Sequence, residues 1–185
     1  MPTTPTHGLR YPALSDAPNV PLHMANLATD VDNLLALPTY AQLLQTTAWN
    51  YTSGGWHPIQ MQSEDFDVNN GHSTSSNPSR WYPGRAGVFA ASGGIAWAPN
   101  SDGRRGVRLV KNGTTAIRGS ASITPATPAS LGNSGVPMRL IFFQLGASDY
   151  IELYGFQDSG ITLSTIVDTL GGEGTTLSVW MVHKL

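Results

Sequence analysis

The residue types that most often carry out chemistry are scattered along this chain. Five histidines occur, and no two of them have the His-x-His or His-x-x-x-His spacing that brings two imidazoles to one metal ion. They are His7, His23, His57, His72 and His183. The sequence has no cysteine nucleophile or thiolate zinc ligand, and no Gly-x-Ser-x-Gly turn that would present a nucleophilic serine. We therefore expect no metal, no cofactor and no enzymatic activity.

One group of carboxylates follows the first predicted strand. It consists of Glu64, Asp65 and Asp67 beside Ser63. Carboxylates this close can hold a cation or serve as the acid and base of a glycosidase. The simpler interpretation, which we prefer, is a solvated loop. A glycan-cleaving enzyme is kept as an alternative function.

The composition points to assembly more than to chemistry. Charged residues make up 12% of the 185 residues, about half of the roughly 25% of an average globular protein. A charge-poor surface often faces another subunit, although a β-rich domain with a Ser/Thr surface has the same composition. The net charge of −2 gives no basis for nucleic-acid binding. No apolar run approaches the ~18 residues of a membrane span, so we expect no membrane insertion.

Prolines define the first segment, residues 1–20, which we predict to be an extended arm. Five of the thirteen prolines lie in the first 21 residues, where they prevent a helix or a central strand. Such an arm would be disordered alone and would become a docking peg on a suitable surface.

Residues 21–48 are predicted to be a helical neck. Met24, Leu27, Val31 and Leu34 recur at spacings of 3, 4 and 3, which is typical of the apolar seam of a coiled coil. A helix of about four turns needs a packing partner. The partner is either the C-terminal domain of the same chain or identical helices in a bundle. Residues 39–48 are expected to add a short second helix.

Residues 49–185 have the texture of an antiparallel β-sandwich, with short alternating runs separated by Gly, Ser, Thr and Asn. The predicted strands cover 57–62, 80–83, 88–98, 106–111, 114–122, 138–145, 150–156 and 177–184. Between two of them, Asn112-Gly113 predicts a hairpin with a type I′ turn.

Three of these strands are apolar on both faces. In 138–145, Phe142 and Phe143 point to opposite faces of the strand. In 150–156 and 177–184, Tyr154 and Trp180 point to one face and aliphatic residues point to the other. One face can fill the sandwich core, and the other needs a separate cover. That cover is either another copy of the chain or the N-terminal helix.

Two stretches resemble the C1q/TNF-like jelly-roll family. RAGVFAASGGIAWAPNSDGRRGVRLVKNG is similar to the family's central strands and hairpin, and LGASDYIELYGFQDSG with the closing LSVWMVHKL is similar to its last strands. The resemblance covers about residues 56–185 and implies an obligate homotrimer. Its interface residues would be Phe143, Tyr150, Tyr154, Phe156 and Trp180, below a neck formed by Met24, Leu27, Val31 and Leu34.

The front end, GLRYPALSDAPNVPLHMANLATDVDNLL, is similar to the N-terminal segment of small structural proteins of actinobacterial tailed phages. This resemblance implies a protein of the virion surface that docks to other virion proteins through Leu9, Tyr11, Pro12 and Leu14. The main hypothesis is a tail fibre or spike knob, and the alternative is a capsid head fibre or decoration protein.

Two polar loops, 69–79 and 124–137, are candidates for recognition of a host glycan or protein, because rigid β scaffolds carry recognition on loops. The candidate contacts are His72, Ser73, Asn77, Leu131 and Asn133. The alternative is that both loops are exposed connectors without a partner.

Overall fold

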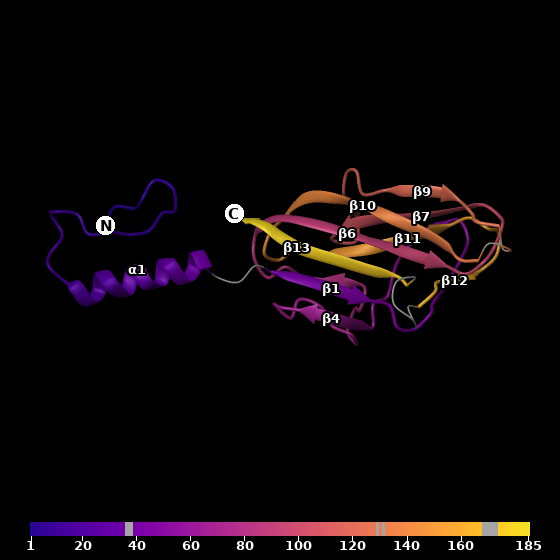
Figure 1. Ribbon diagram of the computed structural model, residues 1–185, viewed down its shortest axis with the longest axis horizontal. Helices are drawn as coiled ribbons and strands as arrows, with labels where there is room; N and C mark the ends of the chain where they lie inside the picture. Colours follow the sequence, from indigo (N-terminus) through magenta and orange to yellow (C-terminus); the bar gives the residue numbers. More distant parts are fainter. Residues whose placement is uncertain (36–38, 129, 131, 168–173) are drawn as a thin grey trace. The chain divides into compact units, whose positions relative to one another are not determined.

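The structure is a computed structural model, and it describes residues 1–35, 39–128, 130, 132–167 and 174–185. The chain forms two compact units, Met1–Pro38 and Thr39–Leu185. The larger unit, which we call the knob, is a sandwich of two antiparallel sheets (Figure 1). It provides all of the β-sheet that carries the candidate sites.

The first sheet has five strands in the order β10-β6-β13-β1-β4. Their bounds are Ser134–Leu145 for β10, Gly87–Trp97 for β6, Thr176–Lys184 for β13, Tyr40–Leu44 for β1 and Ser63–Asp67 for β4. The last strand of the chain therefore lies between β6 and β1, and Figure 1 shows the five strands side by side.

The second sheet has the order β3-β11-β7-β8, with β5 also paired to β11 and β9 also paired to β7. Their bounds are Gly55–Pro58 for β3, Arg80–Trp81 for β5, Arg104–Lys111 for β7, Thr115–Ala116 for β8, Ser122–Pro125 for β9 and Ile151–Gln157 for β11. The short strands β2 (Asn50–Tyr51) and β12 (Leu163–Ser164) pair with each other.

The core fills the space between the two sheets. Its largest fully buried apolar side chains include Trp81, Phe89, Trp97, Leu109 and Leu153. They come from alternate positions on strands of both sheets, as expected when one face of each sheet turns inward. The predicted alternation on the three doubly apolar strands is confirmed.

The strand predictions for 88–98, 106–111, 138–145, 150–156 and 177–184 are confirmed by β6, β7, β10, β11 and β13. The short helix expected over residues 39–48 is wrong, because Tyr40–Leu44 form β1. Ala41 and Leu43 of this strand enter the core, so two buried positions with period two outweigh helix propensity. The knob therefore begins at Thr39, ten residues earlier than expected.

Two further differences concern β4 and the partner of β7. Residues 63–67 form a paired strand where we expected a solvated loop. The predicted strand over 114–122 is broken: only Thr115–Ala116 pair with one end of β7, and Ser122–Pro125 pair with the other end. Between them the chain turns at Gly119, whose φ is +80°.

The type I′ turn between β7 and β8 is confirmed. Asn112 and Gly113 both have positive φ, 53° and 71°, as this turn requires. Asn112 then joins the hairpin to the turn that precedes β11: its side-chain oxygen accepts from the Tyr150 amide at 2.9 Å, and its Nδ2 donates to Asp149 at 2.7 Å. The Asp149 carboxylate also pairs with Lys111 at 2.6 Å. One carboxylate therefore holds two turns together.

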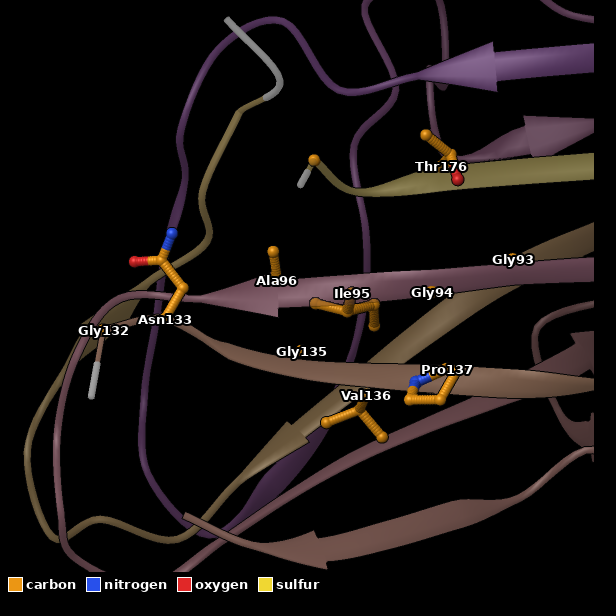
Figure 2. A pocket seen from close by; sticks show the side chains of 11 residues that line it. Gly93, Gly94, Ile95, Ala96, Gly132, Asn133, Gly135, Val136, Pro137 and Thr176 are labelled. Carbon is orange, nitrogen blue, oxygen red and sulfur yellow. The ribbon is translucent and has the colours of Figure 1, made fainter. Parts of the chain in front are cut away.

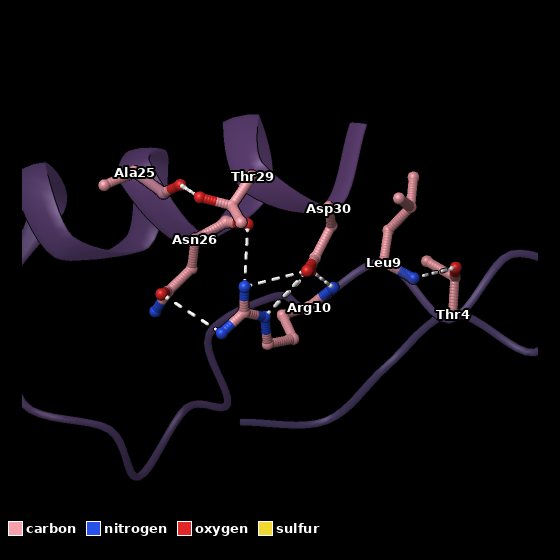
Figure 3. Close-up of polar contacts among 7 residues, drawn as sticks. All are labelled: Thr4, Leu9, Arg10, Ala25, Asn26, Thr29 and Asp30. Carbon is pink, nitrogen blue, oxygen red and sulfur yellow. Dashed lines mark hydrogen bonds and ion pairs between the residues drawn. The ribbon is translucent and has the colours of Figure 1, made fainter. Parts of the chain in front are cut away.

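In the smaller unit, helix α1 (Val20–Leu35) confirms the predicted start and length. Asn19 caps it, since its side-chain oxygen accepts a hydrogen bond from the Leu22 amide at 3.1 Å. The segment before the helix is not extended throughout, because Thr3 and Arg10 pair across a turn. The Arg10 side chain reaches Asp30 and Asn26 of the helix (Figure 3). Those hydrogen bonds lower the pKa of Asp30 and raise the pKa of Arg10.

We predict that Asp149→Asn lowers the free energy of unfolding at pH 7 by about 1 kcal/mol, after allowance for solvent screening. The contacts of this carboxylate with Lys111, Asn112 and the Gly146 amide lower its pKa from 3.8 to about 2. Because the folded-state pKa is depressed, the stabilisation is fully present above pH 4 and disappears as the pH falls through about 2. Urea denaturation at fixed protein concentration between pH 7 and pH 2 measures it.

The exposed Asp65 provides the control. Asp65→Asn should leave the unfolding curve unchanged across this pH range. If Asp149→Asn and the wild-type chain differ by the same amount at pH 2 as at pH 7, the carboxylate does not stabilise the two turns by its charge.

Candidate functional site

The outward side chains of the five-stranded sheet form a continuous surface, which we call the apolar face. Its outward positions are Leu140, Phe142, Ala90, Ser92, Gly94, Ala96, Thr176, Ser178, Trp180, Tyr40, Gln42, Leu44 and Phe66. Their outward direction is inferred from strand alternation, because the neighbouring residues on each strand point into the core. None of these residues carries a charge. The exposed Arg139 lies beside Leu140 in the β10 bulge, so one cation borders them.

An aromatic row crosses this face near the end of the sheet where β1 starts. Phe142 lies opposite Ala90, Ala90 lies opposite Trp180, and Trp180 lies opposite Tyr40. Phe66 on the edge strand completes the row with its ring centroid 5.4 Å from that of Tyr40. Phe142 is 63% exposed and Trp180 is 37% exposed, so these rings form an apolar patch on the surface of the knob.

A polar row follows the aromatic one. Ser178 lies opposite both Ser92 and Gln42. Beyond it, Thr176 lies opposite Gly94 and Leu44. The side chains thus become smaller along the face, from aromatic rings to hydroxyls and then to glycine.

A hollow of about 610 Å³ occupies the small-residue end of the face. Figure 2 shows Gly94 and Ala96 on β6 beside Gly135 and Pro137 on β10, with Thr176 on β13. The glycines differ in how tightly they are packed. A Cβ on Gly93 would lie 2.4 Å from the Thr176 carbonyl oxygen, whereas a Cβ on Gly135 would meet nothing within 4 Å. Close strand packing therefore requires the first glycine, and the open surface lies above the second.

The predicted interface residues are divided between different surfaces. Trp180 belongs to the apolar face. Phe143 points inward, where its ring stacks on Phe89 with a centroid distance of 6.4 Å. Tyr154 and Phe156 lie on the outer face of the other sheet, on β11. Sequence reasoning missed Phe142, Tyr40 and Phe66, although the alternation in 138–145 already placed Phe142 opposite Phe143.

Tyr150 also lies on the outer side of the second sheet. Its ring is 5.3 Å from the Tyr82 ring and lies under the Arg80 guanidinium at 4.5 Å. Arg80 is itself paired with the buried Glu152. This surface combines aromatic rings with arginines, so it differs in character from the apolar face.

The carboxylate group around β4 is used to anchor a loop. The His72 side chain is fully buried, and its two ring nitrogens lie 2.9 Å from Glu64 and 3.0 Å from the Pro78 carbonyl oxygen. Asp67 accepts hydrogen bonds from the His72 amide and from the Trp81 indole. The prediction that His72 contacts a ligand is therefore wrong for its side chain, because that side chain is fully buried. The same hydrogen bonds occupy Glu64 and Asp67, two of the three carboxylates from which a catalytic acid and base would have to come.

The other predicted loop contacts have different positions. Asn77 is exposed with a positive φ of 53°, Ser73 is half-buried, and Asn133 lies at the rim of the hollow (Figure 2). Leu131 lies outside the described residues. Recognition by these loops stays a prediction.

The predicted neck and docking residues fall in the smaller unit. Met24 is 66% exposed and Leu27 is 43% exposed, and Val31 is half-buried; Leu34 lies outside the residues whose side chains are described. The arm contacts the polar side of α1 at Asn26 and Asp30, so the apolar seam is not used by the arm. Among the docking residues, Tyr11, Pro12 and Leu14 are exposed and Leu9 is half-buried.

Within the described part of the chain, no group of three or more His, Cys, Asp or Glu residues is arranged to hold a metal ion. No helix there is long and apolar enough to cross a bilayer.

Comparisons with known proteins identify the fold. No protein-family model and no curated protein sequence matches the chain. Solved structures do match. Murine APRIL at pH 5.0 has a TM-score of 0.58 and 9% identity, over 79% of this chain and 100% of that chain. The globular domain of zebrafish complement 1qA has a TM-score of 0.56 and 10% identity, over 80% and 99%. Eiger TNF from S. frugiperda has a TM-score of 0.57 and 9% identity, over 80% and 94%.

These neighbours are TNF/C1q-family jelly-roll domains, and the knob has their fold. At about 10% identity the likeness establishes the fold alone. The part of the resemblance that concerned the jelly roll is therefore confirmed.

We predict opposite effects for two glycine substitutions near the hollow. Gly135→Val should leave the knob folded and raise its unfolding free energy by up to about 1 kcal/mol, because the site has space and an extended backbone. Gly93→Val should lower the unfolding free energy by about 1–3 kcal/mol, because its Cβ would overlap the neighbouring strand. Thermal unfolding of both variants checks this. A destabilised Gly135→Val would mean that the hollow is filled in the folded protein.

Proposed function

We propose that this chain is a non-enzymatic structural protein of a phage virion, in which a homotrimeric knob is attached to the particle by the N-terminal segment. The knob would act at the tail, as a fibre or spike that contacts the host surface. The observation that carries the assembly part of the proposal is the aromatic row on the apolar face of the five-stranded sheet.

Self-association would explain why aromatic side chains are exposed on this face. A contiguous apolar patch is rarely left exposed on a monomeric protein, and the centre of a protein interface is depleted in charged residues. Burying the row of Phe142, Trp180, Tyr40 and Phe66 against another copy removes apolar surface from water, and the row itself contains no charge to desolvate. A copy of the same chain is the partner available wherever the protein is present.

Three copies are favoured by the family resemblance, because C1q/TNF-like domains pack around a three-fold axis. The exposed Met24 and Leu27 of α1 support the same state, since a helix of 16 residues with an open apolar seam gains stability in a bundle. Attachment to a particle is supported by the similarity of residues 8–35 to tailed-phage proteins and by the exposed Tyr11 and Leu14.

We predict that Trp180→Glu converts the trimer to monomers at micromolar concentration. Truncating a central aromatic residue at an interface typically weakens binding by 2 kcal/mol or more, and a carboxylate adds an unpaired buried charge. Sedimentation equilibrium should give three times 19.7 kDa for the wild-type chain and 19.7 kDa for the variant.

Trp49→Glu is the matched control, because Trp49 is similarly exposed (45%) and lies outside the strands of the apolar face. It should stay trimeric. A wild-type chain that sediments as a folded 19.7 kDa species at this concentration would refute the trimer.

We also predict that deletion of residues 1–20 leaves the knob folded and abolishes incorporation into particles. The knob is a separate compact unit that starts at Thr39, so its folding should not require the arm. Circular dichroism tests the fold, and immunoblotting of purified particles tests incorporation.

Imaging of tagged protein on intact particles then distinguishes the tail from the capsid as the site of attachment. Unchanged incorporation of the deletion variant would contradict the docking role of the arm. It would not affect the trimer proposal, which sedimentation equilibrium tests separately.

A further inference from the structure

Arg108 lies on the outer face of the six-stranded sheet, between two aromatic rings. Its guanidinium carbon is 4.3 Å from the centroid of the Trp56 ring and 5.7 Å from that of Tyr154. Tyr154 is its direct cross-strand partner. Trp56 reaches it because Gly106, in the adjacent row, has no side chain: a Cβ there would lie 3.1 Å from the indole. The absence of a side chain at Gly106 therefore leaves the space in which Trp56 lies beside Arg108.

The other cations of this sheet already have partners. Arg80 pairs with Glu152 at 3.3 Å, Arg104 pairs with Asp158 at 2.7 Å, and Lys111 pairs with Asp149 at 2.6 Å. Arg105, which points inward, donates to the backbone oxygens of Asn100, Asp102 and Arg104. Each of these four side chains therefore has a carboxylate or backbone-oxygen partner within the knob, although the Arg105 Nε, like the Arg108 Nε, is buried without an acceptor.

Arg108 has no such partner among the described residues. Its Nε is buried without a hydrogen-bond acceptor, and within the described part of the knob no hydrogen bond or ion pair involves its terminal nitrogens. Burial lowers the pKa of Arg108, because partial exclusion of water disfavours the charged form. A half-buried guanidinium with unused donors is a strong site for a carboxylate, because charge-assisted bidentate hydrogen bonds gain strength where water is partly excluded.

The surface around Arg108 is rich in aromatic residues. Phe156 lies next to Trp56 with a centroid distance of 5.3 Å, and Ile123 and Phe156 lie on either side of Gly106. Tyr82 and Tyr150 extend the aromatic surface toward β5. Such a surface can pack against the C–H face of a sugar ring. The Tyr154 hydroxyl already donates to the Gly113 carbonyl oxygen at 3.3 Å, so toward a ligand it can act as an acceptor.

Two other classes of ligand fit less well. A nucleic acid needs several free cations to neutralise successive phosphates, and this face offers Arg108 alone. A bound peptide commonly pairs with an open strand edge. Beside Arg108, β7 has no open edge: Tyr154 of β11 pairs on one side, and the Ile117 amide and the Ser120 hydroxyl bond to Leu109 on the other.

We propose that this face is a binding site for a carboxylate-bearing saccharide. The carboxylate accepts two hydrogen bonds from the Arg108 guanidinium, and the sugar ring packs against Trp56 and Tyr154. The proposal deepens the suggested contact with a host surface and rests on that role for its biological setting. Its chemistry does not depend on trimer formation, because the site lies on the sheet opposite the apolar face.

The test is calorimetric titration of the purified full chain with oligogalacturonate, compared with the methyl ester of the same oligosaccharide and with hexaglutamate. Oligogalacturonate should bind, and the ester, which differs only in its missing charges, should bind at least about tenfold more weakly. Arg108→Gln should weaken binding of oligogalacturonate by about tenfold or more. Arg108→Lys, which keeps the charge and loses the planar donor pair, should fall between the two.

Arg118→Gln is the matched control, because it removes the same charge from an exposed position outside the sheet. It should bind like the wild-type chain. Equal losses in the two variants, equal binding of the ester, or tighter binding of hexaglutamate would each overturn the proposal, as would no binding at all.

A measurement on the wild-type chain removes the dependence on variant folding. The Trp56 indole and Arg108 Hε resonances should shift during titration with oligogalacturonate and stay unchanged with the ester. Shifts at other residues only would refute the site. A trimer that fails to bind oligogalacturonate would refute this inference and leave the assembly proposal standing, since sedimentation tests the two separately.

Discussion

Strand β13 lies in the middle of the five-stranded sheet, hydrogen-bonded to β6 on one side and to β1 on the other, and the rest of the knob depends on this pairing. It joins the last segment of the chain to its first strand, with Tyr40 opposite Trp180 and Leu44 opposite Thr176. If β13 did not pair with β6 and β1, the sheet would separate into two pieces, and Leu177 and Val179 of β13, which are buried in the core, would become exposed. Because the contact is long in sequence separation, folding of the knob has to wait until both ends are available.

The same strand connects the core with the surface. Successive side chains of a strand point to opposite faces, so the register that buries Val179 also places Trp180 on the apolar face. A shift of one residue would exchange core and surface along the whole strand. Core packing and the outer aromatic row are therefore determined by one set of hydrogen bonds.

The two outer faces of the sandwich differ in electrostatics. The aromatic row of the apolar face has no charged residue, and the exposed Arg139 borders it, so a second copy can cover the row with few ions to desolvate. The other sheet carries Arg80, Arg104 and Arg108 among aromatic rings. Charges that stay at a surface can bind a ligand, whereas the uncharged face suits permanent burial. The proposed assembly surface and the proposed saccharide site therefore lie on different sheets.

Buried polar side chains hold two of the loops in place. His72 joins its loop to β4 through Glu64. Arg105, fully buried, holds the loop before β7 by bonds to the carbonyl oxygens of Asn100 and Asp102. From sequence, polar loops of this kind had been expected to contact a ligand. A polar residue in a loop is often needed instead to satisfy the backbone groups of that loop.

Local signals made much of the fold predictable from the sequence. Period-two alternation located β6, β7, β10, β11 and β13, and the positive φ preferred by Asn112 and Gly113 identified the hairpin turn. Short segments escaped prediction because their structure comes from distant partners. β1 has five residues and resembles a helix locally, yet it is a strand because β13 and β4 pair with it. The candidate sites depended still more on tertiary structure, since Trp56, Phe156 and Arg108 lie on three different strands.

The sequence by itself determined that this is a β-rich, charge-poor domain after a proline-rich segment and a short amphipathic helix, because composition and periodicity are properties of neighbouring residues. Only the tertiary structure decided which aromatic residues share a surface. Alternation states that Phe142 and Phe143 point in opposite directions, but sheet order decides that Phe142 meets the row of Trp180 and Tyr40 while Phe143 packs on Phe89. The order of strands is set by long-range burial, which no local pattern encodes.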